Sequence, residues 1–133
     1  MRLFPLALKI LGVLFLLPCL LHLALGLGAD AMLGAQVPAA AASDPGLDSQ
    51  NRFYGMIFSL YGILLITSAN DVAKYATILR LLLWVLFAGG IARLVSIAAV
   101  GIPPAAIVLL LMTELVLPPL LLLGLQRELR SAA

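Results

Sequence analysis

Two charged residues interrupt long apolar stretches of this 133-residue chain, Arg93 in one and Glu114 in the next. A formal charge at membrane depth is costly and usually serves a function. If both stretches are helices that cross a membrane, the helical rise places the two residues at similar depths on neighbouring antiparallel helices. The sequence therefore predicts an ion pair between Arg93 and Glu114.

Further polar residues are expected at the same end of the molecule. His22 lies near the end of the first apolar stretch, and Arg52 opens the second. The candidate ligand-binding residues are His22, Asp48, Asn51, Arg52, Tyr54, Arg93 and Glu114. Two arginines against one membrane glutamate predict a positive site that takes an anionic ligand. The sequence predicts no catalytic residue, no metal ligand set and no cofactor.

A structural interpretation of the same residues stays open beside this one. The Arg93–Glu114 pair can serve only to fix the register of two helices, Arg52 can anchor at lipid headgroups, and His22 can be a satisfied core residue. Tyr54 is more typical of packing or of the membrane interface than of a cofactor site. His22 could bind haem only with a second ligand from elsewhere.

Three prolines add polarity within the apolar stretches, because a proline cannot donate to the carbonyl four residues before it. Pro18 frees one carbonyl near His22, and Pro118 and Pro119 free those of Glu114 and Leu115. Unpaired carbonyls at membrane depth need protein, water or ligand to satisfy them. The prolines therefore favour a cavity or a tight polar core.

Composition indicates an integral membrane protein: 64% of the residues are hydrophobic, 11% are charged, and the mean hydropathy is +1.19. Apolar stretches near residues 3–27, 50–69, 74–100 and 103–126 each approach the roughly 20 residues that cross a bilayer as a helix. We predict an all-α integral membrane four-helix bundle, up-down-up-down, formed by residues 1–133 as one domain. Its first external loop is long.

Small residues predict the faces on which these helices pack. They form one stripe with Arg52 in the second helix and another with Arg93 in the third: Arg52, Gly55, Ser59 and Gly62, then Gly89, Arg93 and Ser96. The Pro45-Gly46 turn predicts that the second helix begins after it, with Asp48 or Ser49 as its N-terminal cap. The preceding loop, with Pro38 at a helix start, is long enough to cover the outer opening.

The basic residues predict an orientation. Most lie on one side, namely Arg2, Lys9, Lys74, Arg80, Arg127 and Arg130, whereas the other side carries Arg52 with Asp30, Asp44 and Asp48. By the positive-inside rule both termini are cytoplasmic and the segment 29–48 is external, in the inner membrane of a bacterium. No basic patch with interleaved aromatic residues indicates a nucleic-acid partner.

The first apolar stretch also resembles a secretory signal, with Arg2 and Lys9 before it. It exceeds the 7–15 apolar residues of a typical signal core, so we expect an uncleaved helix. The single cysteine, Cys19, permits no disulfide within the chain and no Cys-x-x-Cys redox pair. Cys19 is expected as a buried apolar residue.

Three segments together resemble a known family over nearly the whole chain. They are Gly46-Leu47-Asp48-Ser49-Gln50-Asn51-Arg52-Phe53-Tyr54-Gly55, Gly89-Gly90-Ile91-Ala92-Arg93-Leu94 and Glu114-Leu115-Val116-Leu117-Pro118-Pro119. The chain resembles the bacterial family called domain of unknown function 4345. This resemblance implies a small four-helix inner-membrane protein, and it supplies no activity, ligand or catalytic residue. The size and layout are also similar to DoxX-type membrane proteins, at the level of the fold alone.

We expect a non-enzymatic accessory or binding protein that holds a lipid-like anionic amphiphile at a polar site in the outer leaflet. One alternative is a proton-coupled small transporter that uses Glu114, although a nearby arginine would favour the ionised carboxylate. Another is a subunit of a membrane redox or enzyme complex. The expected partners are membrane lipids or a small amphiphile, and either a membrane protein or a second copy of the chain.

Overall fold

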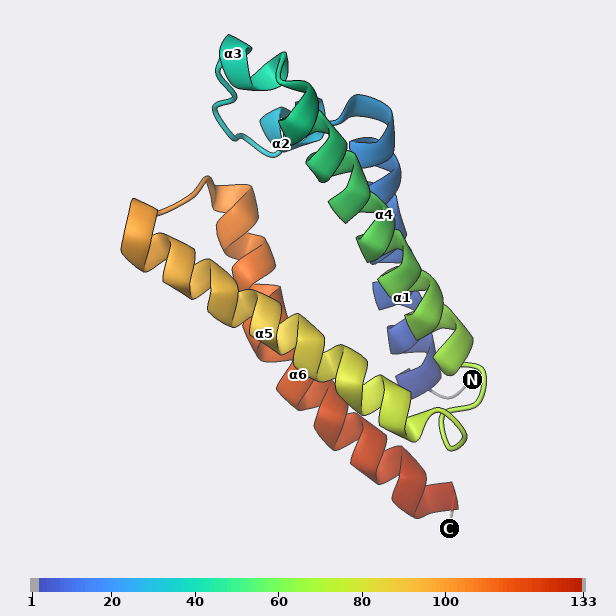
Figure 1. Ribbon diagram of the computed structural model, residues 1–133. Helices are drawn as coiled ribbons and strands as arrows, with labels where there is room; N and C mark the ends of the chain where they lie inside the picture. The colour runs from blue at the N-terminus through green and yellow to red at the C-terminus, as the bar shows by residue number, and fades with distance from the viewer. Residues whose placement is uncertain (1–2, 133) are drawn as a thin grey trace.

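The computed structural model describes residues 3–132, and all regular secondary structure in that range is helical (Figure 1). The long helices are α1 (Leu3–Leu25), α4 (Pro45–Ser68), α5 (Ala76–Val100) and α6 (Ala105–Ala132), with the short helices α2 (Gly28–Met32) and α3 (Ala39–Ala42) between α1 and α4. Helices α1, α5 and α6 are long and apolar enough to cross a membrane. The predicted all-helical class is confirmed, and three of the four helices predicted to cross a membrane have the length and the apolar composition to do so.

Helix α4 begins earlier than predicted. Asp44 is its N-terminal cap, and the side chain of Asp44 accepts a hydrogen bond of 2.9 Å from the backbone N–H of Leu47. Pro45 occupies the first helical position, where its missing N–H is not needed. The prediction of a turn at Pro45-Gly46 with Asp48 or Ser49 as the cap is therefore wrong, because an aspartate followed by a proline starts the helix one turn sooner.

This early start makes α4 different from the other long helices. Its first turns carry the polar residues 48–52, and the apolar part runs only from Phe53 to Ser68. That part is shorter than the roughly 20 residues that span a bilayer as a straight helix. Helix α4 consequently combines an apolar half with a polar end that lies near α2 and α3 (Figure 1).

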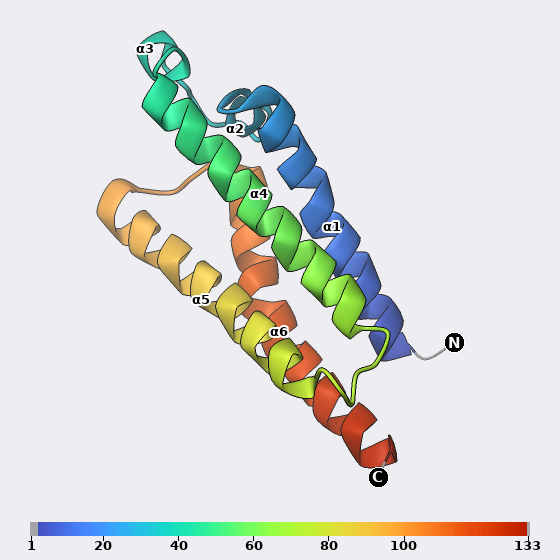
Figure 2. The same cartoon turned by 45° about the vertical axis from the view of Figure 1, so that its right-hand side comes forward.

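Helices α1 and α4 pack closely along their length (Figure 2). A Cβ atom added to Gly62 would lie 2.6 Å from the carbonyl oxygen of Gly12, and one added to Gly12 would lie 2.7 Å from the carbonyl oxygen of Gly62. At the next contact, a Cβ atom on Gly55 would lie 2.8 Å from Cβ of His22. The predicted small stripe of α4 thus faces α1, because only glycine permits such close backbones.

Helices α5 and α6 form the second pair, joined by a short turn that begins at Gly101, whose φ is +112°. A Cβ atom on Gly90 would lie 2.7 Å from Cδ2 of Leu115, so Gly90 marks the close contact. Gly89 and Ser96, which were predicted for this face, are exposed. The packed stripe runs through Leu83, Leu86 and Gly90 to Arg93, so it includes the predicted arginine and replaces Gly89 with Gly90.

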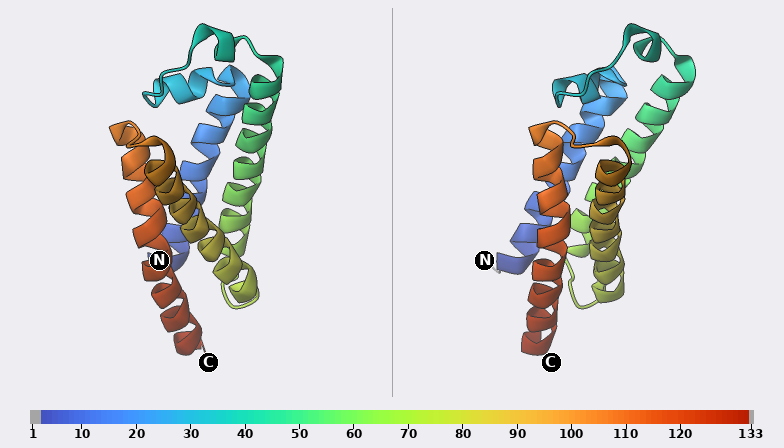
Figure 3. Two further views of the ribbon diagram at one scale, coloured as in Figure 1. Left: turned by 60° about the vertical axis from the view of Figure 1, so that its left-hand side comes forward. Right: turned by 90° about the vertical axis from the view of Figure 1, so that its left-hand side faces the viewer.

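The two pairs meet at the end of the molecule that holds both termini and diverge toward the opposite end (Figures 1 and 3). Leu8, Leu65, Leu79 and Leu125, one from each long helix, form the centre of a shared apolar core at the terminal end. The hydroxyl of Tyr61 in α4 donates to a backbone carbonyl of α5 at 2.5 Å. The core thus fixes the pairs to each other at one end.

The long connection between α1 and α4 crosses the opposite end. A Cβ atom on Gly34 would lie 3.2 Å from Cβ of Pro104, which places the segment after α2 against the turn between α5 and α6. Gly34 has a φ of +92°, a conformation that glycine adopts readily. The connection thus contacts the second pair across the side on which the pairs diverge.

Candidate functional site

Arg93 and Glu114 lie side by side on α5 and α6. Nε of Arg93 donates to Oε2 of Glu114 at 2.7 Å, with 34% of the arginine side chain and 13% of the glutamate side chain exposed. Arg93 continues the inward stripe of α5 one turn beyond the buried Gly90. On α6, Glu114 lies between the buried Leu111 and Pro118 at helical spacing. Packing of the two stripes therefore brings the charges together.

The guanidinium of Arg93 keeps part of its hydrogen-bonding capacity. Within residues 3–132, its one hydrogen bond is the bond from Nε to Glu114. Helical rise puts Arg93 about 10 Å from the end of α5, and Glu114 about 14 Å from the start of α6. If α5 and α6 cross a membrane, these terminal amino groups lie below its surface, where a free donor is costly unless an acceptor reaches it.

A second polar group joins α1, α2 and α4 at the divergent end. Asp30 of α2 accepts a 2.6 Å hydrogen bond from Nδ2 of Asn51, and its Oδ1 lies 3.5 Å from Nε2 of His22. Nδ1 of His22 lies 2.6 Å from the carbonyl oxygen of Pro18 on the preceding turn. Oδ1 of Asn51 is buried and has no hydrogen-bond partner within the described residues. These contacts hold α2 against the two helices.

All three side-chain nitrogens of Arg52 donate hydrogen bonds to neighbouring groups. Nε and Nη2 donate to the two carboxylate oxygens of Asp48 at 2.8 and 3.2 Å, and Nη1 donates to the carbonyl of Leu23 in α1. Asp48 raises the pKa of Arg52, chiefly through the hydrogen bond, so this exposed guanidinium stays charged. Gly26, with a φ of +54°, leaves room for Asp48 where a side chain would collide. Arg52 acts as a clamp between α1 and α4.

The structure thus places the predicted site residues in two groups. Within residues 3–132, no hydrogen bond or ion pair connects Arg93 or Glu114 with His22, Asp48, Asn51 or Arg52. Tyr54 is exposed, and its ring packs edge-on against that of Phe53.

Asp30 belongs to the polar group at the divergent end, although the sequence did not single it out as a site residue. In the sequence, Asp30 counts only toward the charge difference between the two sides of the membrane. In the structure Asp30 contacts both His22 and Asn51. A signal was present, because the glycines at positions 26 and 28 permit a turn that folds α2 back onto α1. Asp30, Asp44 and Asp48 thus outnumber Arg52, the arginine of this group.

The prolines of α6 leave the helix continuous. Pro118 and Pro119 lie inside α6, and Pro118 is buried. Together with Trp84 and Phe87 they line a small apolar crevice of about 120 Å³. The carbonyls that these prolines release belong to Glu114 and to the residue after it, so they add polarity to the helix at the level of the ion pair.

Within the part of the chain that the structure describes, no group of three histidine, cysteine, aspartate or glutamate side chains is placed to hold a metal ion. The buried thiol of Cys19 donates to the carbonyl of Phe15 at 2.8 Å.

Within residues 3–132, these features define a helical protein with three apolar helices of membrane length, two of which carry the charged pair Arg93–Glu114 between them. Residues 3–125 match the family described as "Domain of unknown function (DUF4345)", and the chain belongs to this family. No curated protein and no solved structure matches it.

Proposed function

We propose that this protein is a non-enzymatic binding protein of the bacterial inner membrane that holds a lipid-like anionic amphiphile at Arg93. All four long helices would cross the membrane, with both termini in the cytoplasm and the segment 29–48 outside. The observation that carries the proposal is the guanidinium of Arg93, which pairs through Nε with Glu114 and whose terminal amino groups make no hydrogen bond to the described residues.

The chemistry of the pair supports an anionic head and an apolar tail. Glu114 orients the planar guanidinium, and a carboxylate or phosphate oxygen can then accept from the two remaining nitrogens. Leu94, next to Arg93, and Leu110, one turn from Glu114, are exposed large apolar side chains. A ligand with a charged head and a hydrocarbon tail satisfies both kinds of surface without leaving a charge unpaired in lipid.

The external group has a different role in this proposal. Arg52, His22 and Asn51 hold α2 and the first connection in place, and Gly34 brings that connection to Pro104. The connection would then act as a cover above Arg93, and its own charges are already paired. We therefore assign headgroup binding to Arg93 and assign closure of the divergent end to the clamp at Arg52.

Lipid retention tests the proposal. The wild type, Arg93→Lys, Arg93→Ala and Arg52→Ala are purified in a mild detergent, and bound species are identified by native mass spectrometry. We expect the wild type to retain a fatty acid or an anionic phospholipid, and Arg93→Ala to lose it by about tenfold or more, the cost of one charge-assisted hydrogen bond. Arg93→Lys should retain an intermediate amount, because it keeps the charge and loses the planar fork.

Equal lipid content in the wild type and Arg93→Ala, at matched thermal stability, would refute the assignment. Proton flux in proteoliposomes that disappears in Glu114→Gln would instead favour a transporter, in which the carboxylate rather than the guanidinium is the working group.

A further inference from the structure

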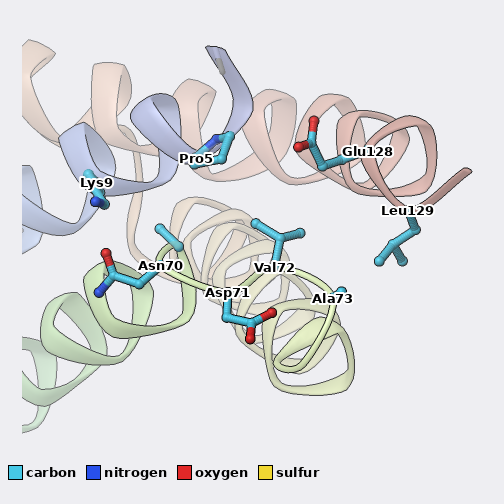
Figure 4. A pocket seen from close by; sticks show the side chains of 9 residues that line it. Pro5, Lys9, Asn70, Asp71, Val72, Ala73, Glu128 and Leu129 are labelled. Atoms are coloured by element: carbon cyan, nitrogen blue, oxygen red, sulfur yellow. The ribbon is translucent and has the colours of Figure 1, made fainter. Parts of the chain in front are cut away.

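A second polar site lies at the opposite end of the molecule, where both termini are found. A pocket of about 320 Å³ opens there between the start of α1, the connection from α4 to α5 and the last turns of α6 (Figure 4). Its charged lining residues are Lys9, Asp71 and Glu128, and Asn70 lines the pocket as well. The volume is within the range of about 300–1,000 Å³ that small-molecule sites occupy.

Lys9 supplies the cationic side of the pocket. It lies about 9 Å along α1 from the start of that helix. Its side chain is exposed, and it makes no hydrogen bond or ion pair within the residues that the structure describes. A lysine at this depth extends its ammonium toward the membrane surface, where phosphates lie. Lys9 is thus a free cation at the level of lipid headgroups.

Asp71 supplies an anionic side that is already fixed in position. Its Oδ1 accepts a 3.0 Å hydrogen bond from the backbone N–H of Lys74, and its carbonyl accepts from Tyr75 at 3.1 Å. The preceding Asn70 is held by a backbone bond to Thr67 at 3.2 Å. Within residues 3–132, the other oxygen of the Asp71 carboxylate makes no hydrogen bond or ion pair. The connection is therefore ordered before any ligand arrives, which lowers the cost of binding.

We propose that this pocket binds the phosphoethanolamine headgroup of a membrane lipid, with Lys9 at the phosphate and Asp71 at the primary ammonium. A zwitterion can pair with both Lys9 and Asp71, whereas a simple anion or cation leaves one of the two unpaired. Glu128, the other carboxylate of the lining, is already engaged in an interaction of its own. Pro5, Val72 and Leu129 add an apolar wall suited to the start of the acyl chains. The inference is independent of the Arg93 site.

Native mass spectrometry in nanodiscs tests this inference. The protein is placed in bilayers that contain equal parts of phosphatidylethanolamine, phosphatidylcholine and phosphatidylglycerol, and the lipids that remain bound on release are counted. We expect phosphatidylethanolamine to dominate, because a quaternary ammonium cannot donate to Asp71 and phosphatidylglycerol has no cation. Lys9→Met and Asp71→Asn should each lower the retained phosphatidylethanolamine by about tenfold.

The variants have matched controls. Asp71→Asn keeps the oxygen that caps Lys74, so loss of binding would report the charge rather than the fold. Lys74→Gln removes a cation of the same connection that does not line the pocket, and it should leave retention unchanged. Soluble glycerophosphoethanolamine should compete weakly if the acyl chains contribute, and full competition would identify a soluble ligand instead. Equal retention of all three lipids, or no effect of Lys9→Met and Asp71→Asn, would overturn the proposal.

Discussion

Arg52 and Arg93 are the same residue type in two different environments. All three guanidinium nitrogens of Arg52 donate to Asp48 or to Leu23, whereas Arg93 makes one bond, through Nε, within the described residues. An arginine whose donors all have partners in the protein links parts of the structure, whereas one with free donors can donate hydrogen bonds to a ligand. Arg52 has a partner one turn away on its own helix, Asp48, as well as Leu23 on α1, whereas the partner of Arg93 lies on α6.

At the residue scale, the Arg93–Glu114 pair should contribute to stability. Arg93→Met and Glu114→Met should each lower the free energy of unfolding by about 1.5–3 kcal/mol, since each leaves a partly buried charge without its hydrogen-bond partner. The double variant should recover much of that loss, because it removes both charges. Unfolding of the four proteins in detergent gives the coupling energy. Strictly additive losses would mean that the pair contributes nothing as a pair.

The clamp at Arg52 leads to a separate prediction. Arg52→Ala should speed amide hydrogen exchange in α2 and the turn before it, because it removes the bond to Leu23 and releases Asp48 beside Gly26. Ser49→Ala, on an exposed residue one turn away, is the matched control and should leave exchange unchanged. Amide hydrogen exchange of both variants in detergent, measured by mass spectrometry, tests this prediction. Identical protection of α2 in both variants would show that other contacts hold it.

At the element scale, helix pairs are specified by where glycine permits close approach. Gly62→Ala should destabilise the protein by about 1–3 kcal/mol, because its new methyl group would overlap the backbone of Gly12. Gly89→Ala is the control, since its nearest neighbour would be 3.9 Å away and alanine favours the helix by about 0.5–1 kcal/mol. The melting temperatures of the two variants, measured by thermal unfolding, are compared with that of the wild type. A stabilising Gly62→Ala would contradict the close packing of α1 on α4.

Much of this element structure could be predicted from the sequence. The apolar stretches gave the long helices to within a few residues at most ends, and helical rise placed Arg93 and Glu114 at similar depths. The start of α4 was missed because Asp44 and Pro45 were interpreted as loop. Helix α2 was missed because a five-residue helix has no periodic pattern of its own and depends on tertiary contacts from Asp30.

At the scale of the whole molecule, the arrangement of the helix pairs could not be predicted from the sequence. Apolar patterns indicate that helices pack, and they do not indicate that the shared core lies at one end and the pairs diverge at the other. The positions of His22 and Arg52 relative to Arg93 depend on that divergence. For this reason the sequence grouped residues that the structure places in two groups.

The proposed orientation is also a property of the whole molecule. Single cysteines at Ala42, before α4, and at Ser131, near the end of α6, are introduced into a variant without Cys19; both positions are exposed. An impermeant thiol reagent on intact cells should label position 42 and should label position 131 only after permeabilisation. The opposite pattern would reverse the orientation. Arg2, one of the basic residues behind this prediction, lies outside the described residues.

The central claim is that Arg93 holds the head of an anionic amphiphile, and crosslinking tests it most directly. A fatty acid with a photoreactive group near its carboxylate is added to the purified protein, and the modified residues are mapped by mass spectrometry. We predict crosslinks within one turn of Arg93 on α5 and of Glu114 on α6, lost in Arg93→Ala and kept in Arg52→Ala. Crosslinks spread evenly over the exposed apolar surface, or unchanged in Arg93→Ala, would contradict the claim.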